Sequence, residues 1–126
     1  MKTIFFSLAI LATLVSCNKE DIESQIIGKY ELVELLLDPG DGSGVFESTS
    51  ISKTLELKSN GDFVSTGDIC SVADSNSFTY EGTYSVADTT IYADSCNFDL
   101  TFSFNNDELI IYYPCIEACK AKYRKI

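Results

Sequence analysis

Residues 54–113 alternate short strand-like segments with tight polar turns, and this pattern limits the possible folds more than any other feature. In the clearest segment, FTYEGTYSV at 78–86, every second residue is Phe, Tyr, Gly, Tyr or Val. Strict alternation of this kind indicates a strand with one buried face. The link SNGD at 59–62 contains the Asn-Gly pair typical of a two-residue hairpin turn. The sequence therefore predicts an antiparallel, all-β chain.

Eight strands are expected, and short links join most of them. They are 28–37, 54–58, 63–66, 78–86, 91–93, 97–104, 108–113 and 120–126. Closing such a meander into an up-and-down barrel removes its exposed sheet edges, so an eight-stranded antiparallel barrel is predicted. A sandwich of two four-stranded sheets is the alternative. In the first strand the alternation slips at 34–37, which indicates a bulge or a strand end buried on both faces.

A short N-terminal helix is expected before the first strand. It spans residues 21–27, with Asp21 as a plausible N-cap, and Gly28 ends it.

The N-terminus reads as a targeting segment outside this fold. Residues 1–16, MKTIFFSLAILATLVS, carry one charge at Lys2 and an apolar stretch from Ile4 to Val15. A bilayer span needs about 20 apolar residues, so this layout is that of a secretory signal.

The tetrapeptide LVSC at 14–17 resembles the lipobox of bacterial lipoproteins. The resemblance implies a lipoprotein signal peptide at 1–16, lipidation of the Cys17 sulfur, and a linker at 17–25. Several acyl chains such as palmitate would hold the protein on the membrane, since each buried methylene contributes about 0.8 kcal/mol. NKED at 18–21 resembles the export signal of surface lipoproteins of the Bacteroidota. It implies an outer-membrane protein on the cell surface rather than the periplasmic face, with a solvated linker as the alternative.

Composition excludes several function classes. The chain has 19 acidic and 9 basic residues, a formal charge of −10, and no histidine. Such a charge argues against binding nucleic acid and against electrostatic binding to an anionic membrane. Without histidine there is no Ser-His or Cys-His catalysis, and the carboxylates form no informative pair. DPGDGSG at 38–44 lacks the alternate oxygen ligands of an EF-hand and reads as a turn-rich loop. We expect a non-enzymatic protein without metal or other cofactor.

Four cysteines besides Cys17 are expected to form disulfides, because their number is even and the chain is exported. They are Cys70, Cys96, Cys115 and Cys119. In a meander successive links alternate between the two ends of the barrel. All four cysteines therefore fall at the end opposite the tight turns at 59–62, 87–90 and 105–107.

The sequence favours one disulfide pairing without excluding the others. Cys115 and Cys119 flank a three-residue loop and can meet disulfide geometry, which pairs Cys70 with Cys96. The crossed pairing, Cys70–Cys119 with Cys96–Cys115, removes more entropy from the unfolded chain. The third combination also stays open.

Gly28-Lys29-Tyr30 opens the first strand, and Arg124 lies in the last. This arrangement resembles that of lipocalins and calycins, in which a Gly-x-Trp stacks on a basic residue of the last strand beneath the closed barrel end. Here Tyr30 replaces the tryptophan, and an arginine over tyrosine contributes about 0.5–2 kcal/mol. The resemblance, most of all to small lipocalin-like lipoproteins of Bacteroidota, implies a single lipocalin-like domain at 26–126 and a floor built from Gly28, Tyr30 and Arg124. The alternative is a core Tyr30 and a solvated Arg124.

The resemblance also implies that the cysteine-bearing end is the mouth at which lipocalins admit ligands. The residues expected to line a ligand site are Phe78, Tyr80, Gly82, Tyr84, Phe98, Phe102 and Tyr123. Gly82 hints at spare volume, but so many rings are equally compatible with a filled core.

The preferred function is a lipid-anchored, non-enzymatic binding protein that holds a small apolar ligand at its disulfide-stapled mouth. The alternative is a filled barrel that contacts an envelope protein, or acts as an inhibitor, through its mouth loops. The sequence does not identify a protein partner.

Overall fold

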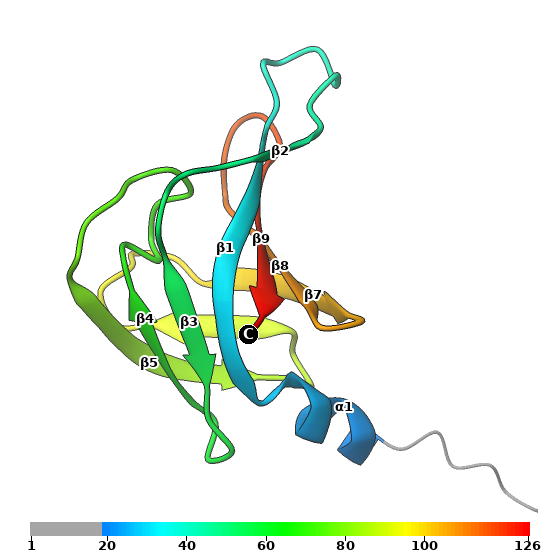
Figure 1. Cartoon of the computed structure of the whole chain (residues 1–126), viewed down its shortest axis with the longest axis vertical. Coiled ribbons are helices and arrows are strands. Elements are labelled where there is room, and N and C mark those ends of the chain that lie inside the picture. The colour runs from blue at the N-terminus through cyan, green and yellow to red at the C-terminus, as the bar shows by residue number, and fades with distance from the viewer. Residues whose placement is uncertain (1–18) are drawn as a thin grey trace, which may run out of the picture.

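The computed structural model describes residues 19–126 as one short helix and nine strands (Figure 1). The elements are α1 (Lys19–Ile26), β1 (Gly28–Leu37), β2 (Phe46–Ser48), β3 (Thr54–Leu57), β4 (Asp62–Thr66), β5 (Thr79–Ser85), β6 (Thr90–Ala93), β7 (Leu100–Asn105), β8 (Glu108–Tyr112) and β9 (Cys119–Lys125). Cys17 and the predicted signal peptide at 1–16 lie outside the described residues.

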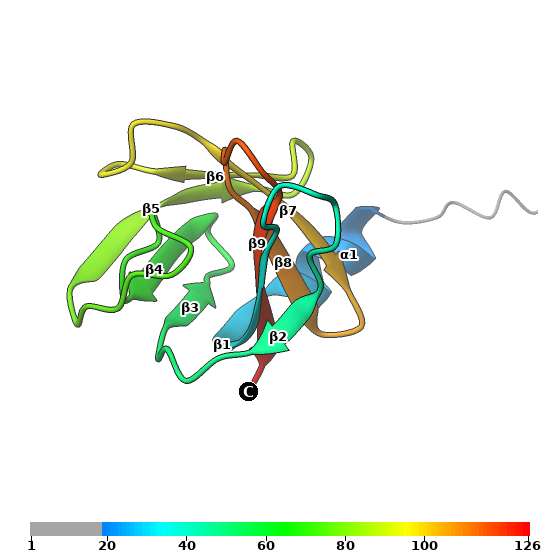
Figure 2. The ribbon, with the colours of Figure 1, turned by 90° about the horizontal axis from the view of Figure 1, so that it is seen from above.

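The sheet closes on itself. Its strand order is β2-β1-β3-β4-β5-β6-β7-β8-β9, every pairing is antiparallel, and β1 also pairs with β9. Eight strands therefore form a barrel that curls around a central core in the view from above (Figure 2), with β2 added outside the closed ring. The predicted all-β, eight-stranded antiparallel barrel is confirmed, and the sandwich alternative is wrong.

One end of the barrel carries α1 and the tight turns; we call it the floor. In the β7–β8 turn, Asn106 and Asp107 have φ angles of 50° and 63°, and Asn105 pairs with Glu108. Two consecutive positive φ angles define the type I′ turn, which suits the twist of an antiparallel pair. The opposite end carries the long loops, and we call it the mouth (Figure 1).

The helix differs in extent from the prediction. It begins at Lys19 and ends at Ile26, so Asp21 lies inside it rather than at its N-cap. The fully buried Ile26 anchors α1 against the barrel floor. Among residues 19–126, none of the helical structure is long and apolar enough to cross a membrane.

β1 contains the expected bulge. Its register against β9 shifts between Leu32 and Glu34, which leaves Val33 as the extra residue. Because of this insertion, Leu35 faces inward like Leu32 although the two are an odd number of residues apart. Beyond the bulge β1 leaves β3 and pairs with β2 instead.

The end of β1, the following loop and β2 rise above the mouth (Figure 1). We call this segment, residues 35–49, the flap. The sequence did not predict β2, which is only three residues long.

Buried side chains fill the barrel interior. The largest fully buried ones are Tyr30, Tyr123, Lys53, Phe63, Ile26, Leu55, Leu57, Ile69, Ile91, Leu100, Leu109 and Ile111. The spare volume inferred from Gly82 is absent at that position: a Cβ there would collide with the backbone oxygen of Tyr92 and would lie 2.7 Å from Cε1 of Phe63. Phe63 lies directly opposite Gly82 in the β4–β5 pair, so its ring occupies the space that the glycine leaves.

Candidate functional site

Two disulfides constrain the mouth loops. Cys70 in the β4–β5 loop is bonded to Cys96 in the β6–β7 loop, and Cys115 is bonded to Cys119 across the β8–β9 loop. The Cα atoms are 5.3 Å and 6.0 Å apart, within the usual range for disulfides. The expected disulfide bonds are therefore present at one end of the barrel: the first joins two loops, and the second closes a single loop.

The β4–β5 loop packs onto the core at the mouth. Its Ile69 is fully buried, and Cys70, Val72 and Ala73 pack against the same core. A loop anchored by a buried side chain and a disulfide is held in place at the mouth.

Lys53 binds this loop through hydrogen bonds to its backbone. Its side chain is 2% exposed, and its Nζ donates to the backbone oxygens of Asp68 at 2.9 Å and Ser71 at 2.6 Å. Burial lowers the pKa of Lys53, while the nearby carboxylates of Asp68 and Asp74 act in the opposite direction. The buried ammonium thus satisfies carbonyl groups that would otherwise be unpaired.

The flap loop is ordered by one carboxylate. The oxygens of Asp38 accept backbone N–H groups from Gly40 at 2.8 Å, Gly42 at 3.0 Å and Gly44 at 2.8 Å. These bonds favour the ionised form and lower the pKa of Asp38, the bond from Gly44 most of all. In the described part of the chain, no three His, Cys, Asp or Glu side chains cluster so as to hold a metal ion.

The predicted stacking of Arg124 on Tyr30 is wrong. Arg124 pairs opposite Glu31 on the outer face of the barrel, and its Nη2 lies 3.0 Å from Oε1 of Glu108. Lys125 is the basic residue over Tyr30: it lies directly opposite in register, and its Nζ is 5.7 Å from the ring centroid. Strand parity in the sequence could have found it, because an inward Tyr123 places Arg124 outward and Lys125 inward.

Gly28 makes room for Lys125. A Cβ on Gly28, whose φ is 148°, would lie 2.6 Å from Cε of Lys125. The lysine Nζ donates to the backbone oxygen of Gln25, and the Tyr30 hydroxyl donates to that of Ile26 at 2.6 Å. Both acceptors lie in the last turn of α1, where helix carbonyl groups lack partners within the helix. These bonds join α1 to the floor, and burial is the main cause that raises the pKa of Tyr30.

The residues predicted to line a ligand site do not surround one cavity. Phe102 and Tyr123 are buried in the core, whereas Tyr80, Gly82 and Tyr84 are only partly buried.

Phe78 and Phe98 were expected to face inward, but they are 70% and 36% exposed. Both lie at the mouth, just outside β5 and β7, whose strands begin at Thr79 and Leu100. Alternation correctly describes the two faces of a strand, but a residue beyond the barrel rim has no opposite wall to pack against.

Exposed large apolar side chains are concentrated at the mouth. Five of them stand on the flap or the mouth loops; we call them the apolar rim, and they are Leu37, Val45, Phe78, Phe98 and Ile116. Solvent-exposed apolar groups gathered on one region typically mark an interaction surface. The rim and the two disulfides occupy the same end of the barrel.

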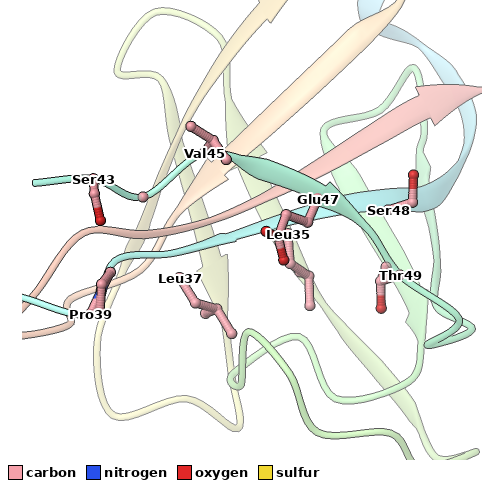
Figure 3. A pocket seen from close by; sticks show the side chains of 9 residues that line it. Leu35, Leu37, Pro39, Ser43, Val45, Glu47, Ser48 and Thr49 are labelled. Atoms are coloured by element: carbon pink, nitrogen blue, oxygen red, sulfur yellow. The ribbon is translucent and has the colours of Figure 1, made fainter.

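The flap also encloses a shallow hollow of about 420 Å³. Leu35, Leu37 and Thr49 point to one side of the flap, and Ser48 points to the other (Figure 3). Glu47 lies opposite Leu35 in register and so shares its face.

Comparison of the chain with protein-family models, curated proteins and solved structures found no match.

Proposed function

We propose that this chain is a lipid-anchored, non-enzymatic interaction protein of the bacterial outer membrane that binds a partner protein with its mouth. The observation that supports this proposal most directly is the apolar rim at one end of the barrel. Phe78, Phe98 and Ile116 of this rim stand on loops that contain a disulfide, and its other two residues stand on the flap. Loops fixed in advance lose little conformational entropy on binding, so their apolar contacts translate more fully into affinity. Of the two functions expected from the sequence, this one agrees better with a filled interior.

A small apolar ligand inside the barrel receives less support. Phe63 fills the space next to Gly82, and Ile69 is buried beneath the mouth loops. An eight-stranded barrel has room for packed side chains or for one small ligand, and here the side chains occupy the interior.

An anchor at Cys17 would leave the mouth free. Cys17 precedes the first described residue by two positions, and two residues span at most about 7 Å. A lipid on Cys17 would therefore join the barrel through α1 at the floor, with the apolar rim at the opposite end. The NKED motif supports the cell surface as the proposed location, and an anchor at the floor would leave the mouth free to meet a partner there.

Site-specific photo-crosslinking of the full lipoprotein in its native host tests the interaction. A photo-reactive phenylalanine replaces Phe78 or Ile116 at the mouth, and Ile22 or Ile126 at the floor serves as the matched exposed control. We expect a discrete crosslinked protein from the mouth positions and none from the floor positions. Equal labelling of both ends, or a small apolar molecule that co-purifies in native mass spectrometry, would contradict the proposal.

The anchor has a separate test. Cells grown with an alkyne fatty acid should incorporate the label into the wild-type chain and not into Cys17→Ser. We expect the Cys17→Ser chain to leave the membrane fraction as well, because several acyl chains provide the membrane affinity. Labelling that persists in Cys17→Ser would place the lipid elsewhere or refute the anchor.

A further inference from the structure

β2 adds an exposed edge to a sheet that is otherwise closed into a barrel. It stands at the end of the strand order and pairs with β1 alone, through Leu36–Phe46, Leu35–Glu47 and Glu34–Ser48. Barrel closure normally removes such edges, because an exposed edge can pair with another chain.

The register shows which backbone groups of β2 face outward. The backbone N–H of Thr49 donates to the oxygen of Val33 at 3.2 Å, so the backbone N–H and C=O groups of Thr49 face β1. The backbone N–H and C=O groups of successive residues face opposite sides of a strand. Those of Glu47 therefore also face β1, while those of Phe46 and Ser48 face away from it. The N–H and C=O groups of Phe46 and Ser48 can therefore form a ladder with one more strand.

A strand added there would run beside the hollow in the flap. Its residue opposite Glu47 would share the face on which Leu35 and Leu37 line that hollow, and its next residues on that face would lie near Val45 and Thr49. On the other face Phe46 is covered by Lys122, whose Nζ lies 4.3 Å from the ring centroid. On the hollow face, the exposed Leu37 and Val45 offer apolar contacts to side chains of the added strand.

Charge indicates which side chain fits opposite Glu47. Glu47 is exposed, and in the described part of the chain no basic side chain comes within ion-pair distance of its carboxylate. Lys122, the basic residue next to Phe46, is paired with Glu34 instead. Opposite charges directly across two strands are stabilising, so the position facing Glu47 suits lysine or arginine.

The same charges disfavour a second copy of this chain. Pairing of β2 with β2 across a twofold axis would bring two Glu47 side chains together between molecules with a formal charge of −10 each. Like charges across strands destabilise a pair.

We propose that the edge of β2 binds an extended segment of a partner protein by strand addition, with a basic residue opposite Glu47 and apolar residues over the hollow of the flap. This inference rests on the proposed function and specifies its partner as a basic, extended peptide. Backbone bonds of the added strand provide affinity, and the side chains that face the hollow provide specificity.

The test selects short randomised peptides displayed on phage against the full lipoprotein in detergent micelles. We expect selected peptides to share a lysine or arginine flanked at alternate positions by apolar residues. In NMR spectra, binding should shift the amide signals of Phe46 and Ser48. Peptides without a basic residue, or no selected peptide at all, would overturn the inference.

Ser48→Pro and Ser48→Ala form a matched pair for this edge. Proline removes the outward N–H of Ser48 without removing a bond to β1, whereas alanine keeps that N–H. We expect Ser48→Pro to weaken binding of a selected peptide about tenfold or more, and Ser48→Ala to change it less than about twofold. Glu47→Lys should also weaken binding, and thermal unfolding of each variant checks the fold.

Equal affinity of Ser48→Pro and Ser48→Ala would exclude strand addition. A dimer in sedimentation that Ser48→Pro abolishes would make a second copy the occupant and overturn the assignment of a basic partner. The crosslinking experiment at Phe78 and Ile116 does not involve β2. A crosslinked partner there would support the proposed function even if strand addition fails.

Discussion

Tyr30 and Tyr123 are both fully buried, but their hydroxyls are paired differently. That of Tyr30 donates to the backbone oxygen of Ile26 at 2.6 Å, whereas that of Tyr123 has, in the described part of the chain, only the hydroxyl of Tyr113 beside it, without good hydrogen-bond geometry. Removing the Tyr30 hydroxyl would leave the oxygen of Ile26 without its donor, whereas removing the Tyr123 hydroxyl loses at most a poorly aligned contact with Tyr113 and relieves the burial of a polar group. We expect Tyr30→Phe to lower the free energy of unfolding by about 1–2 kcal/mol, and Tyr123→Phe to leave it unchanged or raise it. Urea unfolding of the two variants measures the difference, and equal losses would contradict it.

Lys125 and Arg124 are adjacent residues with opposite roles. Lys125 bonds to the end of α1 and lies over Tyr30, whereas Arg124 forms an exposed ion pair with Glu108. We expect Lys125→Met to cost about 1–2 kcal/mol of unfolding free energy. An exposed ion pair typically contributes less than about 1 kcal/mol, so Arg124→Met should cost less. A larger loss for Arg124→Met in thermal or urea unfolding would show that the floor depends on the outer residue.

At the scale of elements, the two disulfides should differ in strength. Cys70 and Cys96 are 26 positions apart, and Cys115 and Cys119 are 4 apart. In the loop-entropy relation a longer closed loop restricts the unfolded chain more, which gives about 3.5 kcal/mol for the first bond and about 2 kcal/mol for the second.

Unfolding of the two double variants tests this difference. Replacing both Cys70 and Cys96 by alanine should lower the urea midpoint more than replacing both Cys115 and Cys119. Each variant keeps the other disulfide intact as an internal control. The opposite order would mean that loop length does not decide the contribution of these bonds.

The flap contains one element that the sequence predicted and one that it did not. The bulge in β1 was indicated by the slip in alternation, because an extra residue changes which face each later side chain occupies. β2 was not predicted, since three residues are too few to show a period. It exists because β1 continues past β3 and offers it a partner.

At the scale of the whole molecule, the buried tyrosines should make the barrel sensitive to alkali. Burial is the main cause that raises the pKa of Tyr30, Tyr113 and Tyr123 above the ordinary value of 10.0. The unfolded chain then loses these protons first, so above about pH 10 the folded chain holds up to about three more protons. The stability they contribute is complete below that pH and falls as the pH rises toward their folded pKa values, by at most about 4 kcal/mol per pH unit.

Urea unfolding between about pH 9 and about pH 11 measures this loss. Lys53 acts in the opposite direction, because burial lowers its pKa, but its effect ends near its ordinary value of 10.5. Tyr123→Phe removes one titrating group and should reduce the slope above that pH by about a third. A midpoint that does not fall with pH would contradict the role of these side chains.

The candidate site was predictable only in part. The sequence placed the cysteines at one end of the barrel, because short links in a meander alternate between the ends. The sequence also predicts that Phe78 and Phe98 face inward, but both are exposed at the mouth. Strand parity puts Lys125 on the same inward face as Tyr123, whereas the resemblance to lipocalins predicted Arg124 in this role.

The sequence alone determined the all-β class, the antiparallel order and the position of the tight turns. These features depend on alternation and turn residues, which act between neighbours along the chain. The tertiary structure decided that Phe63 fills the space beside Gly82, that Ile69 packs beneath the mouth and that β2 offers an edge. Each of these depends on which residues the register of the strands and the closure of the barrel bring together, and neighbours along the chain do not determine that.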